Sequence, residues 1–194
     1  MPSRYLRLVE LVIEKSLRRG NFILSSGKPS SYYIDGKMTC MDPEGATVIA
    51  DAILSEIKDL DVDAVGGMDM GATPIVGAVA TRSFETGRPL PVFVVRKESK
   101  HHGTMKAIEG PLQPNSKVVI VDDVVTTGGS ILKAIEAVEK VGCKVLLAIT
   151  VLDRDAGAAE ALAEHRIPYR PLVTLEDIGI KNEPNRPSSK VSTG

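Results

Sequence analysis

The chain has 194 residues, of which 43% are hydrophobic and 25% charged, and its formal net charge at pH 7 is −1. That length suffices for one domain with a sizeable core, while the near-neutral charge provides no overall field to attract nucleic acid or a membrane surface. Aromatic residues are scarce at 4%, which argues against a stacking surface for single-stranded nucleic acid. No apolar run is long enough to cross a membrane and the N-terminus lacks a signal-peptide core, so we expect a cytoplasmic protein without nucleic-acid or membrane partners.

The first forty residues are expected to form a helix and a hairpin. An amphipathic pattern predicts a helix over 4–18, and FILSSGKPSSYYID at 22–35 predicts a hairpin around a Gly-Lys-Pro turn. We expect this part, about 1–40, to form a small hood. A further helix is predicted over 44–58, where apolar residues recur on one side.

From residue 62 onward, short apolar stretches alternate with helical patterns. Strands are predicted at 62–67, 91–95, 117–123 and 144–152, and helices at about 74–84, 131–142 and 155–165. Strands that are apolar on both faces and separated by helices indicate an α/β fold with a parallel sheet covered on both sides. We expect a single domain with its core at about 41–178 and a polar tail at about 181–194. The two cysteines, Cys40 and Cys143, have no metal-site spacing and are expected to be structural.

Ligands bind to sheets of this kind at the carboxyl ends of the strands. Four segments are therefore expected along one edge: 66–72, the stretch from Arg96 onward, 122–130 and 153–157.

The most informative of these segments is VVIVDDVVTTGGSI at 118–131. The two glycines would let the backbone turn tightly, Ser130 is placed to cap the following helix, and free amides at a helix start attract phosphate. Asp122 and Asp123 would repel a phosphate, but they suit sugar hydroxyls or the waters of a divalent cation. A phosphorylated ribose would satisfy both halves of the segment.

Other interpretations stay open on this segment alone. Response-regulator receiver domains also carry VIVDD, but near their start rather than two-thirds along the chain. A P-loop would need a Gly-Lys-Ser/Thr sequence, which does not follow here. A plain strand–turn–helix with polar ends would need no ligand at all.

The segment resembles the phosphoribosyl-diphosphate (PRPP) binding motif of the type I phosphoribosyltransferases. In that motif a hydrophobic strand, two acids, a hydroxyl-rich loop and glycines follow in fixed order. The resemblance implies the fold of that family, with a hood over a parallel sheet. It also implies Mg²⁺ as cofactor, carried by PRPP with its waters near the two acids and without a direct protein ligand. The implied PRPP-binding residues of the segment are Asp122, Asp123, Val124, Val125, Thr126, Thr127, Gly128, Gly129 and Ser130.

A second signal lies in the long connection between the strands that end near Val95 and begin near Lys117. Its first part, RKESKHHG at 96–103, is basic. This composition is typical either of a solvated hairpin or of a mobile lid that neutralises a diphosphate leaving group. RKxxKxHG followed by IEG resembles the catalytic loop of orotate phosphoribosyltransferases. The resemblance implies a homodimer in which this loop acts in the partner's site. It implies diphosphate contacts from Arg96, Lys97, Lys100 and His102, with Lys97, Lys100, His102 and Asp123 as the catalytic residues.

A third signal is VLDRDAGAAEAL at 151–162, which sets Arg154 just beyond a strand end between Asp153 and Asp155. A salt-bridged surface arginine would explain this pattern. Orotate enzymes carry a similar Asp-Arg, and the carboxylate and carbonyls of orotate suit a guanidinium, so the resemblance implies that Arg154 and Thr126 bind orotate.

Two more segments are similar to that family. The hairpin at 22–35 matches its base-covering hairpin, although Ser25 stands where many members have lysine and the lysine here is Lys28. The glycine-rich stretch 66–80 occupies the place of its diphosphate-binding loop.

Together the resemblances imply transfer of the 5-phosphoribosyl group from PRPP to orotate in de novo pyrimidine (UMP) biosynthesis, giving orotidine 5′-monophosphate and diphosphate. A purine or uracil phosphoribosyltransferase would share the PRPP motif without needing RKxxKxHG or Arg154. A PRPP-sensing regulator would keep the PRPP loop and add a surface for nucleic acid.

Overall fold

The computed structural model of the protein describes residues 4–23, 27, 29–97 and 107–180. Its main body is a six-stranded sheet in the order β5–β4–β3–β6–β7–β8. Neighbouring strands pair in parallel except β4 and β5, which are antiparallel. The predicted parallel sheet is confirmed, with a short antiparallel strand added at one edge. The strands are β3 (Ala64–Met68), β4 (Val92–Val95), β5 (Ile108–Glu109), β6 (Lys117–Val125), β7 (Lys144–Asp153) and β8 (Tyr169–Thr174).

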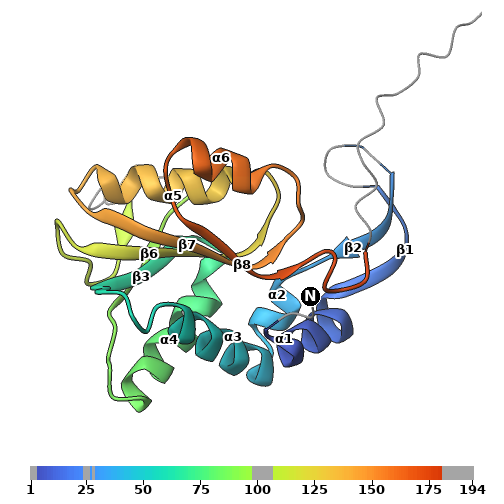
Figure 1. Cartoon of the computed structure of the whole chain (residues 1–194), viewed down its shortest axis with the longest axis horizontal. Helices are drawn as coiled ribbons and strands as arrows, with labels where there is room; N and C mark the ends of the chain where they lie inside the picture. The colour runs from blue at the N-terminus through green and yellow to red at the C-terminus, as the bar shows by residue number, and fades with distance from the viewer. Residues whose placement is uncertain (1–3, 24–26, 28, 98–106, 181–194) are drawn as a thin grey trace, which may run out of the picture.

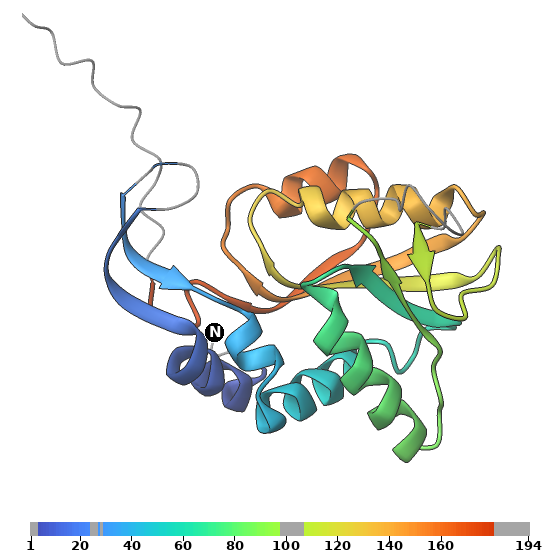
Figure 2. The same ribbon diagram turned by 180° about the vertical axis from the view of Figure 1, so that it is seen from behind.

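Helices cover both faces of this sheet. Figures 1 and 2 show α3 (Pro43–Glu56) and α4 (Ala72–Glu85) on one face and α5 (Gly129–Glu139) and α6 (Ala158–Glu164) on the other. The side chains of β6 divide between two cores: Val119 and Val121 pack with α3 and α4, and Val118 and Ile120 pack with α5. This division explains the unbroken apolar run in the sequence, because a strand buried on both faces cannot alternate with polar residues.

The N-terminal segment differs from the single helix predicted over 4–18. The helix α1 (Leu6–Leu11) continues as a π-helical stretch, η1 (Val12–Ser16), and the chain then becomes the strand β1 (Leu17–Ile23). Helical structure stops early because Leu17 is buried in β1, where it pairs with the buried Ile34.

The predicted hairpin is confirmed. Strand β1 pairs antiparallel with β2 (Pro29–Ile34) to form a separate two-stranded sheet. A four-residue helix, α2 (Lys37–Cys40), leads back toward the main body. The hairpin stands beyond the carboxyl ends of β6, β7 and β8, on the right in Figure 1. It therefore faces the edge at which ligands are expected.

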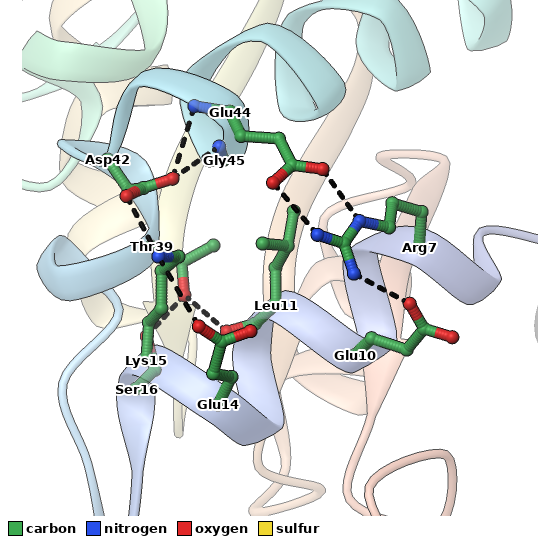
Figure 3. Close-up of polar contacts among 10 residues, drawn as sticks. All are labelled: Arg7, Glu10, Leu11, Glu14, Lys15, Ser16, Thr39, Asp42, Glu44 and Gly45. Atoms are coloured by element: carbon green, nitrogen blue, oxygen red, sulfur yellow. Dashed lines mark hydrogen bonds and ion pairs between the residues drawn. The ribbon is translucent and has the colours of Figure 1, made fainter.

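Polar contacts fasten η1 to the start of α3, as Figure 3 shows. The carboxylate of Asp42 caps α3 by accepting backbone hydrogen bonds from Glu44 and Gly45 at 3.1 and 3.0 Å, and its other oxygen lies 3.0 Å from Lys15 Nζ. Nearby, the buried hydroxyls of Ser16 and Thr39 are 2.6 Å apart. These contacts set the position from which the hairpin leaves the helical layer.

Neither cysteine forms a disulfide in the part of the chain that the structure describes. Cys40 and Cys143 are free and buried, and burial raises the pKa of the Cys40 thiol, which keeps it protonated and unreactive. In the ranges that the structure describes, no helix is both long and apolar enough to cross a membrane.

Candidate active site

The four segments expected at one edge of the sheet do meet there. Strands β3, β4, β6 and β7 are parallel, and their carboxyl ends lie side by side: Met68 pairs with Val95, and Val125 with Asp153. This edge, from the β3–α4 loop to the turn after β7, is called the rim below. The prediction of its place is confirmed, because parallel pairing brings all strand ends of one polarity to one side.

Asp122 and Asp123 lie within β6, as the strand predicted over 117–123 implies, with exposed fractions of 5% and 8%. Both approach the backbone of Gly71 in the β3–α4 loop. A Cβ atom on Gly71 would lie 2.2 Å from Asp122 Oδ1 and 2.6 Å from Asp123 Oδ1. Only glycine lets the loop come so close to the two acids.

Ser130 does not cap α5, so that expectation was wrong. The residue at the cap position is Gly128, which is left-handed with φ 81°, and the tight turn predicted for the glycines is present. The Ser130 hydroxyl instead donates to Asp122 Oδ2 at 2.5 Å. Burial raises the pKa of Asp122 to about 6, and the bond from Ser130 partly opposes that effect.

The loop between β6 and α5 is open to solvent. Thr126, Thr127 and Gly129 are exposed, and they directly precede or begin the helix α5. Free N–H groups and the positive end of the helix dipole suit a phosphate at this place. The backbone of Val125 is engaged differently, because its carbonyl accepts the N–H of Arg154 at 3.0 Å.

A lysine that the sequence analysis missed lies beside Asp123. Lys37 Nζ is 3.8 Å from Asp123 Oδ2 and 3.0 Å from Asp35 Oδ1, and the bond with Asp35 is the main cause that raises the pKa of Lys37. The backbone at Gly36, directly before Lys37, packs closely against β6. A Cβ on Gly36 would lie 2.5 Å from Val124 Cγ2. The signal in the sequence was available: Gly36 and Lys37 directly follow the hairpin motif that ends at Asp35.

Arg154 faces the hood. Its guanidinium carbon lies 5.7 Å from the centroid of the Tyr32 ring in β2, within the range of a cation–π contact. The neighbouring Asp153 does not behave as the surface partner that a salt-bridged arginine would need. It is buried and accepts hydrogen bonds from the Tyr169 hydroxyl at 2.9 Å and from the Asp155 N–H at 2.8 Å.

The two ends of the basic loop are fastened together. Arg96 donates its N–H to the carbonyl of Ala107 at 2.8 Å, and its guanidinium bonds Glu109 Oε1 at 2.8 Å. Lys97 is exposed just beyond. Lys100 and His102 lie outside the described residues, as do Ser25 and Lys28 of the hairpin.

A cavity of about 580 Å³ adjoins the rim beyond Arg154, at the ends of β7 and β8. Its lining includes the acidic residues Asp153, Asp155 and Glu176. An acidic wall is unsuited to an anionic base, so the part of the rim at Arg154 that faces the hood is the better candidate for base recognition.

Comparisons with known proteins match this geometry. Residues 42–167 match the family described as "Phosphoribosyl transferase domain". The orotate phosphoribosyltransferase of Rhodopseudomonas palustris (strain BisB5) is 43% identical over 170 residues, which cover 86% of this chain and 91% of that protein. That of Rhodopirellula baltica is 42% identical over 180 residues, covering 90% and 93%.

Solved structures agree. The Mycobacterium tuberculosis orotate phosphoribosyltransferase in complex with PRPP has a TM-score of 0.78 at 35% identity, covering 91% of this chain and 99% of that one. The adenine phosphoribosyltransferase of Leishmania donovani shares the fold, with a TM-score of 0.63 at 19% identity over 96% of this chain and 86% of that one. The sheet, the hood hairpin and the acidic rim define a type I phosphoribosyltransferase. Within this class, the chain belongs to the orotate phosphoribosyltransferase family.

Proposed function

We propose that the protein transfers the 5-phosphoribosyl group of PRPP to orotate, giving orotidine 5′-monophosphate and diphosphate, in the cytoplasmic synthesis of UMP. One observation carries the proposal: Arg154 lies at the same rim as the two buried acids of β6 and faces the hood residue Tyr32. A site for a sugar phosphate and a site for an anionic base are thus contiguous.

PRPP has a place for each of its parts. Its 5-phosphate would bind residues 126–130 at the start of α5, where Thr126, Thr127 and Gly129 are exposed and where the first N–H groups of a helix have no partner within the helix. Its ribose hydroxyls would donate to Asp122 and Asp123, which are acceptors when ionised. Its diphosphate would lie along the β3–α4 loop, whose backbone reaches the acids at Gly71.

The residues present fit an Mg²⁺ ion that arrives with PRPP. Asp122 and Asp123 supply the oxygen donors that Mg²⁺ prefers, but two carboxylates alone do not complete an octahedral shell. Among the residues that the structure describes, no group of three or more His, Cys, Asp or Glu side chains could hold a metal ion. When bound, Mg²⁺ would neutralise the diphosphate, and the two acids would orient its waters.

The reaction needs no covalent nucleophile. A ring nitrogen of orotate would attack the anomeric carbon of the ribose as the bond to diphosphate breaks, and the proton of that nitrogen would pass to water or to the diphosphate. Negative charge then gathers on the leaving group, and the cations Lys97, Lys100 and His102 of the basic loop would stabilise it together with Arg96. Positioning and electrostatics would supply most of the rate, and a closed loop would keep water away from PRPP.

Orotate would lie between the rim and the hood. The guanidinium of Arg154 offers paired donors to the carboxylate or ring carbonyls of the base, and the exposed Thr126 offers a second contact. The ring of Tyr32 supports this placement because it already holds Arg154 on the side of the hood.

A homodimer whose basic loop acts in the partner's site is part of the proposal. The exposed side of α4 supports it. Met70, in the loop before α4, and Phe84, near the end of α4, have exposed fractions of 62% and 75%, and they flank the exposed small residues Thr73, Gly77 and Thr81. These positions are symmetric about Gly77, so a second copy packed antiparallel would set Met70 against Phe84 of the partner subunit.

The test is turnover with PRPP and Mg²⁺, followed as the loss of orotate absorbance, with uracil, adenine and hypoxanthine offered in parallel. Turnover of orotate alone supports the proposal. Turnover of another base would keep the PRPP site and overturn the base assignment. Binding of PRPP without turnover of any base would favour a PRPP-sensing regulator. An Asp122→Asn, Asp123→Asn variant controls for a contaminating enzyme.

A further inference from the structure

The backbone around Arg154 is held on both sides. Its own N–H donates to the Val125 carbonyl at 3.0 Å, and the next N–H, of Asp155, donates to Asp153 Oδ1 at 2.8 Å. Asp155 has φ 49°, in the left-handed region that residues other than glycine rarely adopt. The Asp153 carboxylate thus closes a tight turn around Arg154 and determines the direction in which its side chain leaves the strand.

The carboxylate that closes this turn is held in place by two hydroxyls. The Tyr169 hydroxyl, on β8, donates to Asp153 Oδ2 at 2.9 Å and lies 2.8 Å from Thr150 Oγ1 on β7. Because the single phenolic hydrogen is used on Asp153, Thr150 must donate to the Tyr169 oxygen. Thr150 is fully buried, and burial is the main cause that raises the pKa of Tyr169, so this order of donors persists at physiological pH.

We propose that Tyr169 is a positioning residue that sets the affinity for orotate: it holds Asp153, and through Asp153 it aims Arg154 at the base. The inference rests on the proposed function, because it gives Arg154 its role there. Tyr169 would not contact orotate itself, because its hydroxyl is already bonded to Asp153 and Thr150.

The chain contains a matched pair that separates positioning from stability. Tyr5, directly before α1, also donates its hydroxyl to a carboxylate, that of Glu56 on α3, at 2.5 Å. Replacing either tyrosine by phenylalanine removes one hydroxyl–carboxylate bond between two elements, and Tyr169→Phe also removes the bond from the buried Thr150. Only the bond of Tyr169 leads to the rim.

The first measurement compares Tyr169→Phe with Tyr5→Phe. Tyr169→Phe should raise the KM for orotate about tenfold, the effect expected when a hydrogen bond to a charged group is lost. The KM for PRPP should change by less than about twofold, because the Asp153 carboxylate bonds Tyr169 and Asp155 rather than residues 126–130. Tyr5→Phe should leave both KM values unchanged. It should lower the melting temperature of the protein by about as much as Tyr169→Phe does.

The second measurement is a double-mutant cycle with Arg154→Ala. If Tyr169 acts through Arg154, then Tyr169→Phe should add nothing to the orotate KM of Arg154→Ala. Additive effects, or an equal rise in the KM for PRPP, would overturn the inference. The proposed function fails separately: a wild-type protein that does not turn over orotate refutes it, whereas an active wild type with an unaltered Tyr169→Phe variant refutes only the role of Tyr169.

Discussion

The hydroxyl of Ser130 donates to a carboxylate oxygen of Asp122 across 2.5 Å and so joins the first turn of α5 to the buried end of β6. Burial raises the pKa of Asp122 to about 6, whereas the bond from Ser130 favours the charged carboxylate. The charge of an acid proposed to hold the ribose is therefore set by two opposing effects, and each can be changed by substitution.

Removing the hydroxyl should move the pH dependence of the reaction. In Ser130→Ala the pKa of Asp122 should rise by about one unit, since a hydrogen bond to a charged group is lost. If ionised Asp122 accepts from the ribose, the acid limb of the profile of kcat/KM for PRPP should move to higher pH by the same amount. An acid limb that stays in place would remove Asp122 from the groups that control PRPP binding.

Burial of Asp122 should cost stability at neutral pH. Its pKa is higher in the folded state than the ordinary value of 3.8, so the folded protein binds more protons between about pH 4 and 6 and loses stability as pH rises through that range. The loss amounts to about 3 kcal/mol above pH 6. Asp122→Asn should therefore increase the free energy of unfolding at pH 7.5 more than at pH 4, while abolishing activity. Urea titrations at both pH values measure the difference, and equal effects would contradict the raised pKa.

Gly71 should tolerate no side chain. In Gly71→Ala the new Cβ would meet Asp122 Oδ1 at 2.2 Å, so the loop must move away from the acids, and we expect kcat/KM for PRPP to fall at least about a hundredfold. Thr47→Ala is the control, at an exposed position of α3 outside the proposed dimer contact on α4. It should stabilise the helix by about 0.5 kcal/mol in a thermal melt without reducing turnover. Similar activity losses in both variants would count against a special role for Gly71.

Lys37 should assist PRPP binding through its charge. It lies 3.8 Å from Asp123 and offsets part of the negative charge that the diphosphate must approach. Lys37→Ala is expected to raise the KM for PRPP about tenfold at low salt and less at high salt. The exposed Lys58, paired with Asp59 at 4.0 Å, provides the control Lys58→Ala, for which no change is expected. An effect of Lys37→Ala independent of salt would point to packing rather than charge.

A site shared between two chains predicts complementation. Lys100→Ala removes a cation of the basic loop and Asp123→Asn an acid of the rim, so each homodimer should lose most of its activity. Mixed dimers would contain one intact site, and activity should recover to about a quarter of the wild-type value per chain when equal amounts exchange.

The exposed side of α4 can be tested in the same assay. Phe84→Glu in both chains sets a carboxylate against the apolar Met70 of the partner subunit at each end of the proposed contact, and it should abolish the recovery together with the dimer in size-exclusion chromatography. A dimer and a recovery that both persist with Phe84→Glu would exclude this surface, and no recovery in intact dimers would place each site within one chain.

Local patterns in the sequence were sufficient to predict most of the strands and helices of the fold. The apolar run before Asp122 predicts a strand buried on both faces, and the glycines after it predict a tight turn into a helix, because such signals depend on neighbours along the chain. Strand β8 was not predicted, because Arg170 and Pro171 interrupt its apolar pattern. An edge strand such as β8 tolerates these two residues. The end of the first helix was also predicted wrongly, because Leu17 pairs with Ile34 in the hairpin and this tertiary contact overrides the local helical pattern.

The sequence by itself determined most of the strands and helices in chain order, the rim as the place of the candidate site and the residue types gathered there. The tertiary structure alone decided which atoms meet: Ser130 with Asp122 rather than with the helix start, Lys37 with Asp123, and Tyr169 with Asp153. These contacts join segments that are separate in the chain. Their partners are chosen by the parallel pairing of strands and by the packing of the hood, which no local period encodes.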